Sequence, residues 1–308
     1  MSRGLVIISG ATGFIGRALL QDLSENGYDI AVLTRDREKA RAQFGDGAII
    51  AEWDGKTSRG WLELASRSNA IINLAGENIG AGRWTEQRKQ RIVQSRIDAG
   101  KAVTEAVQKA SVKPKTVIQA SAVGYYGPKE DESLDESSPP GAGFLAETVR
   151  RWELSTREVE DSGVRRIVIR SGLVLGKDGG TLPRFFIPFR FFIGGPLGTG
   201  KQWFPWIHWK DEIAAIRFLL EREDARGVFN LVSPCSVTMK EFARTLGREL
   251  KRPSWFPVPA FLLRLLFGEM AEETLLSSQR VLPTALLKAG HTFQYPEIES
   301  ALRDILAA

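Results

Sequence analysis

The sequence is poor in the residues that form disulfides and metal sites. It has one cysteine, Cys235, and two histidines, His208 and His291, in 308 residues. A single thiol excludes an intrachain disulfide and a thiol-based metal cluster, and two distant histidines argue against a zinc site. We therefore expect no metal, and a reducing, cytoplasmic compartment.

Long apolar runs are also absent. No uninterrupted apolar stretch reaches the ~18 residues of a membrane-spanning helix, and the nearest candidate, 255–267, is broken by Pro257, Pro259 and Arg264. This stretch predicts a packed helix after a proline-rich turn, with a membrane-surface or partner-binding face over 260–267 as the alternative. The first predicted strand begins close to the start of the chain, so we expect no signal or transit peptide.

The charge is close to balance. Lys and Arg number 42 and Asp and Glu 37, which gives a net charge of +5. The basic residues are scattered without a long run, so nucleic acid is not an expected partner. A hydrophobic content of 43% predicts a soluble globular protein with a sizeable core.

Three glycines follow the first apolar run of the chain. The run from Leu5 predicts a buried strand and the segment 17–26 a helix, so the glycines lie on the turn between them. Gly10 permits a tight turn, Gly13 lets the backbone approach a phosphate, and Gly16 lets the helix pack on the strand. The free N–H groups of the helix then face an anion. This pattern predicts a dinucleotide-binding turn, lined by Gly10, Thr12, Gly13, Phe14, Ile15 and Gly16.

The next strand, predicted over 29–33, bears on the choice of cofactor. An acidic residue at its end, about 20 residues beyond the glycines, would accept the ribose 2′-hydroxyl of NAD. Thr34 and Arg35 stand there instead, and a guanidinium pairs with the 2′-phosphate of NADP. We therefore predict NADP. A shift of one residue would place Asp36 there and restore NAD, and Arg35 as a solvated loop charge is the other alternative.

Strands and helices continue to alternate to about residue 176. The fold class is therefore α/β, a Rossmann doubly wound parallel sheet with a small, mainly helical C-terminal substrate domain. Further strands are predicted over 48–52, 70–76, 117–122 and 166–176, and a long helix over 85–110. The predicted division is a Rossmann domain of 1–176, to which 209–233 return, and a substrate or lid domain of 177–208 and 234–308.

Small residues end the strand over 70–76. Leu74, Ala75 and Gly76 let the backbone approach the cofactor, and Arg96 on the following helix is a candidate phosphate contact.

Local patterns mark several helix ends. Gly27 is placed for a left-handed C-terminal cap, and Thr238 and Glu241 have the spacing of a capping box. Asp211 is a candidate cap for the helix after 203–209. His208 is interpreted as a buried hydrogen-bonding residue rather than a base.

These motifs together resemble the extended short-chain dehydrogenase/reductase family. The chain is most similar to its atypical "epimerase family" branch, sometimes labelled cell-division-inhibitor-like. The motifs are 9–16 (Ser-Gly-Ala-Thr-Gly-Phe-Ile-Gly), 73–79 (Asn-Leu-Ala-Gly-Glu-Asn-Ile), 94–96, 122–127, 195–198, 206–211 and 275–283. The resemblance covers essentially the whole chain. It implies a Rossmann domain that holds NADP, with Thr34 and Arg35 on the 2′-phosphate and Leu74, Ala75 and Arg96 lining the cofactor. It also implies a possible homodimer.

The sequence departs from that family at the residues that move protons. Family members that react use a Ser or Thr after the fifth strand and a Tyr-x-x-x-Lys pair on one face of the next helix. The helix expected here, 144–153, has neither Tyr nor Lys. A matching string runs from Tyr125 to Lys129, but Gly127 and Pro128 argue against one continuous helix, so we interpret the match as coincidental.

The catalytic candidates are therefore unusual. Ser121 would polarise a substrate oxygen, and Tyr125, Tyr126 or Glu147 would move the proton. Alternatively, the tyrosines pack against the nicotinamide or the lid, and Ser121 bonds backbone. The sequence predicts an NADP-dependent oxidoreductase or epimerase of a small hydroxyl- or carbonyl-bearing substrate. The alternative is a non-catalytic NADP(H)-dependent regulatory protein related to division.

Overall fold

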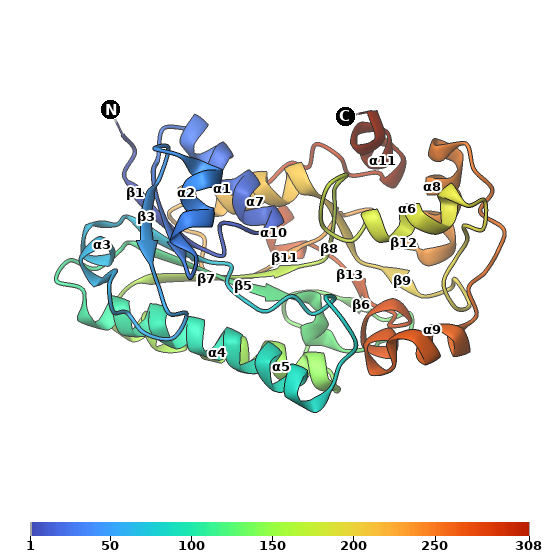
Figure 1. Ribbon diagram of the computed structural model, residues 1–308, viewed down its shortest axis with the longest axis horizontal. Helices are drawn as coiled ribbons and strands as arrows, with labels where there is room; N and C mark the ends of the chain where they lie inside the picture. The colour runs from blue at the N-terminus through green and yellow to red at the C-terminus, as the bar shows by residue number, and fades with distance from the viewer. Residues whose placement is uncertain (1, 308) are drawn as a thin grey trace.

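A parallel sheet of seven strands forms the centre of the computed structural model, which describes residues 2–307 (Figure 1). The strand order is β11-β7-β5-β4-β1-β2-β3, and every neighbouring pair is parallel. The strands are β1 (Leu5–Ser9), β2 (Asp29–Thr34), β3 (Ile49–Glu52), β4 (Ala70–Asn73), β5 (Thr116–Ala122), β7 (Arg165–Ser171) and β11 (Gly227–Leu231). The order reverses between β1 and β4, and open α/β sheets bind ligands beyond the carboxyl ends of the strands at such a point. The predicted doubly wound sheet is confirmed.

Helices cover both faces of the sheet because side chains alternate along each strand. In β1, Val6 and Ile8 enter one core, and Leu5 and Ile7 enter the other. The first core is covered by α1 (Phe14–Glu25), α2 (Arg37–Phe44), α7 (Trp209–Glu221) and α10 (Thr284–Lys288). The opposite face is covered by α3 (Leu62–Arg67), α4 (Glu86–Lys109) and α5 (Phe144–Leu154), with short helices η1 (Val123–Tyr126) and η2 (Arg157–Ser162) beside α5.

A smaller, mainly helical part lies at the end of the molecule away from β3 (Figure 1). Its core includes Phe185, Phe204, Phe242 and Leu302. The helices here are α6 (Pro183–Arg190), α8 (Met239–Leu250), α9 (Ala260–Phe267), η3 (Ala271–Leu275) and α11 (Ile298–Ala307). Short strand pairs join β8 (Leu173–Leu175) to β10 (Trp206–His208), β9 (Trp203–Phe204) to β12 (Val237–Thr238), and β6 (Ser133–Leu134) to β13 (Arg280–Val281). Within residues 2–307, no helix combines the length and apolar character needed to cross a membrane.

The chain passes between the two parts more than once. α7 packs against α1, and β11 pairs with β7. Leu286 and Phe293, which the sequence assigned to the C-terminal part, pack in the core of the sheet. The division into two domains remains a proposal, and residues around α10 belong physically to the sheet.

Two predicted helix ends are confirmed. Gly27 follows the C-terminal end of α1 with φ 84°. The Thr238 hydroxyl accepts from the Glu241 backbone N–H at 3.3 Å, and the Glu241 carboxylate accepts from the Thr238 backbone N–H at 2.7 Å. Both motifs satisfy backbone groups that the helix itself leaves unpaired.

The predicted cap of α7 is wrong. His208, not Asp211, caps this helix, because its Nδ1 accepts from the Lys210 backbone N–H at 3.1 Å. The Asp211 carboxylate instead accepts from the backbone N–H groups of Gln294 and Tyr295, at 2.7 and 2.9 Å. Burial lowers the pKa of His208 to about 4, so the ring is neutral and is the buried hydrogen-bonding residue that was expected.

A second titratable side chain is buried in the first turn of α7. Ser171 Oγ donates to Glu212 Oε1 at 2.5 Å, and Glu212 Oε2 has no partner among the residues described. Burial raises the pKa of Glu212 to about 8.

This burial makes a pH dependence of stability predictable. An unfolded glutamate titrates near ~4.3, so above that pH the folded chain holds a proton that the unfolded chain has lost. The stability contributed by Glu212 is therefore complete at low pH and is lost as the pH rises through about 8. We expect the melting temperature of Glu212→Gln to fall less than that of the wild type between about pH 6 and 8. Glu86→Gln, at a surface position, should follow the wild type; equal pH slopes for all three proteins would contradict the prediction.

Candidate functional site

The turn between β1 and α1 brings three backbone segments into contact. Gly10 has φ 71°, and a Cβ on it would lie 2.8 Å from the carbonyl atoms of Leu74 at the end of β4. A Cβ on Gly16 would lie 2.4 Å from the oxygen of Gly10. Contacts below 3.0 Å are not tolerated against backbone. Glycine is therefore required at both positions.

The N-terminus of α1 offers unpaired donors. No side chain caps it, and its first helical bond runs from the Arg17 N–H to the Gly13 carbonyl at 3.0 Å. The backbone N–H groups of Phe14, Ile15 and Gly16 thus have no acceptor among residues 2–307. Such a terminus is a binding site for an anion such as a pyrophosphate.

The side chain of Phe14 has a different role from its N–H group. Its ring occupies a slot beside Gly176 and Gly179, where an added Cβ would come within 2.3 and 2.2 Å of it. This contact ties the segment after β8 to the glycine turn. Sequence reasoning missed it, although the glycine cluster at 176–180 was visible.

Arg35 and Asp36, the two candidate contacts for the cofactor's ribose, differ in their bonding at the end of β2. Asp36 Oδ1 accepts from the Lys39 N–H at 3.0 Å and caps α2, and the Asp36 N–H donates to the Thr34 hydroxyl at 3.1 Å. Arg35 is exposed and pairs with no carboxylate in the described part of the chain. The carboxylate is engaged, and the guanidinium is available.

A second cation lies beside the end of β4. Arg96 Nη1 donates to the carbonyls of Glu77 and Ile92, at 3.0 and 2.9 Å, and the guanidinium lies 4.9 Å from the Trp152 ring centre. A Cβ on Gly76 would lie 3.2 Å from Cζ of the Arg96 guanidinium. Burial lowers the pKa of Arg96 to about 10, and the charge of Glu77 offsets this only in part. An anion at the carboxyl edge of β4 would neutralise it.

The structure therefore gathers the predicted cofactor residues around one switch point. Those on the β1–α1 turn and in the first turn of α1 are Gly10, Thr12, Gly13, Phe14, Ile15 and Gly16; those at or just beyond the ends of β2 and β4 are Thr34, Arg35, Leu74, Ala75 and Gly76; Arg96 comes from α4. A backbone that approaches closely, free N–H groups and two unpaired arginines fit a phosphorylated dinucleotide.

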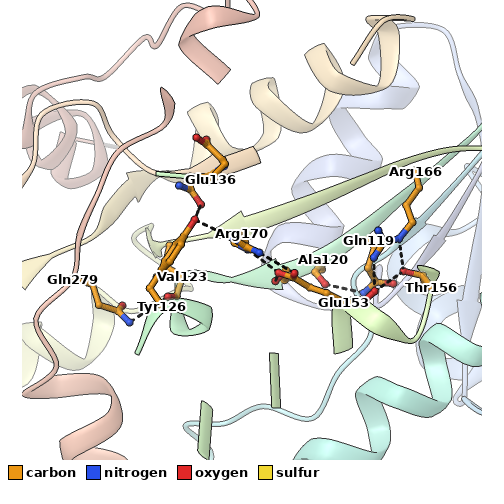
Figure 2. A network of polar contacts seen from close by, with 12 residues as sticks. Gln119, Ala120, Val123, Tyr126, Glu136, Glu153, Thr156, Arg166, Arg170 and Gln279 are labelled. Carbon is orange, nitrogen blue, oxygen red and sulfur yellow. Dashed lines mark hydrogen bonds and ion pairs between the residues drawn. The ribbon is translucent and has the colours of Figure 1, made fainter. Parts of the chain in front are cut away.

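The end of β5 holds a buried polar network (Figure 2). Ser121 Oγ donates to Glu153 Oε1 at 2.6 Å. Arg170 binds the same carboxylate with two bonds of 2.8 and 3.0 Å, and its Nη1 donates to the Tyr126 hydroxyl at 3.0 Å. That hydroxyl donates to Asn230 Oδ1 at 2.7 Å.

Burial fixes the protonation of this network. Tyr126 is fully buried, and burial, partly offset by Arg170, raises its pKa to about 12. Burial would lower the pKa of Arg170, but its hydrogen bonds and charge interaction with Glu153 outweigh this and raise it. Tyr126 therefore keeps its proton at neutral pH, and Arg170 keeps its charge.

Tyr125 adjoins this network through its ring, and Glu147 lies outside it. The Tyr125 ring lies 3.4 Å below the Arg170 guanidinium, and its hydroxyl has no hydrogen bond to a described residue. It lines a hollow of about 240 Å³ with Arg150, Glu153, Leu154, Arg157, Glu160 and Arg166. Glu147 is exposed and pairs with Arg150 at 2.8 Å. Ser121, Tyr125 and Tyr126 thus gather around the Arg170–Glu153 pair, and Glu147 does not join them.

The absence of a Tyr/Lys pair on α5 is confirmed. The face of α5 toward η1 carries Leu145 and Val149, one turn apart, whose side chains would lie 3.4 and 3.9 Å from a Cβ on Gly124. The Tyr125–Lys129 string is not helical, because η1 ends at Tyr126 and Gly127 follows with φ 61°.

Sequence reasoning missed the network's charged centre. Glu153, Arg170 and Asn230 are all buried or nearly so. One signal was present: Arg170 interrupts the apolar run of β7, and a charge in a strand buried on both faces requires a partner.

The parallel order and the glycine turn at its switch point define a Rossmann protein of the extended short-chain dehydrogenase/reductase class. Residues 6–231 match the NAD dependent epimerase/dehydratase family, and residues 258–305 match a domain of unknown function, DUF1731. The chain belongs to the NAD dependent epimerase/dehydratase family.

Relatives extend this similarity over the whole chain. It is 41% identical to the "Epimerase family protein SDR39U1 homolog, chloroplastic" of Arabidopsis thaliana, over 99% of this chain and 87% of that protein. It is 37% identical to "Epimerase family protein YfhF" of Bacillus subtilis, over 98% of each. The crystal structure of human epimerase family protein SDR39U1 with NADPH superposes with a TM-score of 0.89 at 35% identity, over 98% of this chain and 99% of that one.

The buried network predicts unequal costs for two glutamates. Glu153→Gln leaves Arg170 buried without its carboxylate, and we expect a loss of about 3 kcal/mol in the free energy of unfolding. Glu147→Gln, which removes an exposed pair, should cost less than about 1 kcal/mol. Urea unfolding measures both, and similar small losses would show that the Arg170 charge does not depend on Glu153.

Proposed function

We propose that the chain binds NADP(H) at the switch point between β1 and β4, with Arg35 on the 2′-phosphate. The observation that carries this proposal is at the end of β2. The Asp36 carboxylate accepts a hydrogen bond from the N-terminus of α2. Arg35, next to it in the chain, has no acidic partner among the described residues. A carboxylate so engaged is a poor acceptor for a ribose hydroxyl, whereas a guanidinium forms strong paired bonds with phosphate. The NADPH in the crystal structure of the human relative supports the same choice.

Calorimetric titration tests this assignment. For Arg35→Ala we expect NADP affinity to fall about tenfold to a hundredfold, since a charge-assisted bond contributes about 1.5–3 kcal/mol, with NAD affinity almost unchanged. Asp36→Ala is the matched control: it should lose about 1 kcal/mol of stability with the helix cap but keep its preference for NADP. Tighter binding of NAD than of NADP by the wild type would overturn the proposal.

We further propose that the protein is an oxidoreductase or epimerase acting on a small molecule with a hydroxyl or carbonyl group. A bound nicotinamide supplies or accepts a hydride, so the chain must bind the substrate and manage the proton. Ser121 stands at the end of β5 with lone pairs left to accept a bond, and Tyr125 has the unpaired hydroxyl of the two tyrosines. Tyr126, which holds its proton, acts as a positioning residue for Arg170.

A non-catalytic, NADP(H)-dependent regulatory protein is the second candidate. Two observations favour it: the side of α5 toward η1 carries only Leu145 and Val149, and the Ser121 hydroxyl is hydrogen-bonded to Glu153. On this proposal the bound cofactor stabilises one conformation of the chain, and that conformation binds a partner instead of forming a product.

Turnover separates the two candidates. NADPH oxidation with a panel of sugars and ketones, and NADP reduction with alcohols, should reveal hydride transfer if the protein is an enzyme. Ser121→Ala should then lower kcat about a hundredfold, as loss of a polarising hydroxyl does, while Ser137→Ala at an exposed loop should not. NADPH binding by each variant controls for folding. Tight NADPH binding with no turnover across the panel would favour the regulatory protein.

A further inference from the structure

A large apolar surface is exposed at the far end of the smaller part. Phe191 is 71% exposed, Trp255 75% and Phe261 68%. We call the whole set the apolar face; it consists of Phe191, Phe192, Ile193, Trp255, Phe256, Phe261, Leu262, Leu265 and Leu266. Large exposed apolar patches are rare on monomers and mark interaction sites.

Backbone hydrogen bonds join two of the segments that carry the apolar face. The Phe256 N–H donates to the Gly194 carbonyl at 3.3 Å, and the Val258 N–H donates to the Pro196 carbonyl at 2.9 Å. These bonds hold the segment after α6 against the segment before α9. Both helices lie at the same end of the molecule (Figure 1).

One side of α9 forms part of the apolar face. Phe261 and Leu265 are one turn apart, as are Leu262 and Leu266, and all four are exposed, whereas Leu263 is only 4% exposed. The helix is thus fixed on one side and unpartnered on the other.

Cations without an ion-pair partner lie along one edge of the apolar face. Arg190, Arg244, Lys251 and Arg252 form no ion pair with any residue in 2–307. Of the nearby acids, Glu272 pairs with Arg264 and Glu299 with Arg248, whereas Glu241 and Glu273 accept from backbone N–H groups. The four cations that form the rim therefore have no ion-pair partner among the described residues.

Two of these arginines lie directly beside aromatic side chains. The Arg252 guanidinium lies 4.5 Å from the Phe192 ring centre. A surface hollow of about 500 Å³ is lined by Arg244, Thr245, Arg248, Arg252, Pro253, Ser254 and Trp255. An anionic group in this hollow would meet guanidinium donors at the edge of the apolar face.

This arrangement selects among possible occupants. A second copy in a two-fold contact would place the same cationic rim against itself. A helical partner would bury the leucines of α9 but would not by itself supply the anionic groups that the arginines beside Trp255 can bind. A bilayer with anionic headgroups accepts protruding Trp, Phe and Leu at its interface and attracts Arg and Lys to its phosphates.

We propose that the apolar face docks on the surface of a membrane that contains anionic phospholipid, with α9 lying along the interface. The arginines in the hollow beside Trp255 bind lipid phosphate. This surface binding needs no membrane-crossing helix, and it is independent of the proposed cofactor chemistry.

Sedimentation of the full chain with lipid vesicles tests the proposal. The vesicles contain phosphatidylcholine alone or phosphatidylcholine with about 30% phosphatidylglycerol. We expect binding to the mixed vesicles at least tenfold tighter than to the neutral ones, and weaker at high salt. Phe261→Ser with Leu265→Ser should lower binding to the mixed vesicles at least tenfold. Arg244→Gln with Arg252→Gln should lower it about 25-fold, from roughly fivefold for each basic side chain.

Matched controls keep the result interpretable. Val112 and Leu287 are 66% and 47% exposed and lie outside the apolar face, so Val112→Ser with Leu287→Ser should bind as the wild type does. Circular dichroism and NADPH titration verify that each variant is folded. Failure to pellet with either vesicle, or equal pelleting by the Phe261/Leu265 variant, overturns the proposal. A dimer in sedimentation velocity that this variant dissociates, without vesicle binding by the wild type, assigns the face to a second copy instead.

Discussion

The site depends on the contact of three backbone segments without side chains between them. Gly10 touches the end of β4 at Leu74, and Gly16 touches Gly10 itself. The Leu74 N–H donates to the Ser9 carbonyl at 3.2 Å, so the turn and the end of β4 are bonded as well as packed. The free N–H groups of α1 and the backbone after β4 are thereby held at a fixed separation. Any side chain at these contacts would push α1 away from the sheet and open the anion site.

Arg35 and Asp36 differ in whether their charges already have a partner. Both stand at the end of β2, where the sequence alone allowed either to select the cofactor. The carboxylate has a local use, because α2 begins one residue later and its N–H groups need an acceptor. The guanidinium has no such use, and Arg96 beside the end of β4 forms no ion pair in the described chain, although the charge of Glu77 acts on it. Two arginines without an ion pair, together with the free N–H groups of α1, can accept more anionic charge than that of a pyrophosphate alone, which is the difference between NADP and NAD.

Much of this was predictable because the signals are local. Apolar runs mark strands buried on both faces, and Gly27 and the Thr238 capping box mark helix ends. The cap of α7 was mispredicted because two polar residues, His208 and Asp211, compete over one helix turn. The Arg170–Glu153 pair was not predictable in detail, since its partners come from β7 and α5 and nothing in their spacing joins them. Leu286 joins the sheet core for a similar reason: periodicity shows that a side is buried, not against which core.

Whether the protein can catalyse a reaction depends on which hydroxyl groups of the buried network are free to bond a substrate. Glu153 accepts a hydrogen bond from the Ser121 hydroxyl, so Ser121 can donate to a substrate oxygen only by giving up its bond to Glu153. Tyr126 is held by Arg170 and Asn230 with its proton retained, so it gives neither acid nor base at neutral pH. Tyr125 keeps an unpaired hydroxyl and lines a hollow beside α5 together with Glu153. An enzyme that uses Ser121 as a hydrogen-bond donor therefore requires Ser121 to release Glu153 when substrate binds. A cofactor-dependent regulator requires no such exchange of hydrogen-bond partners.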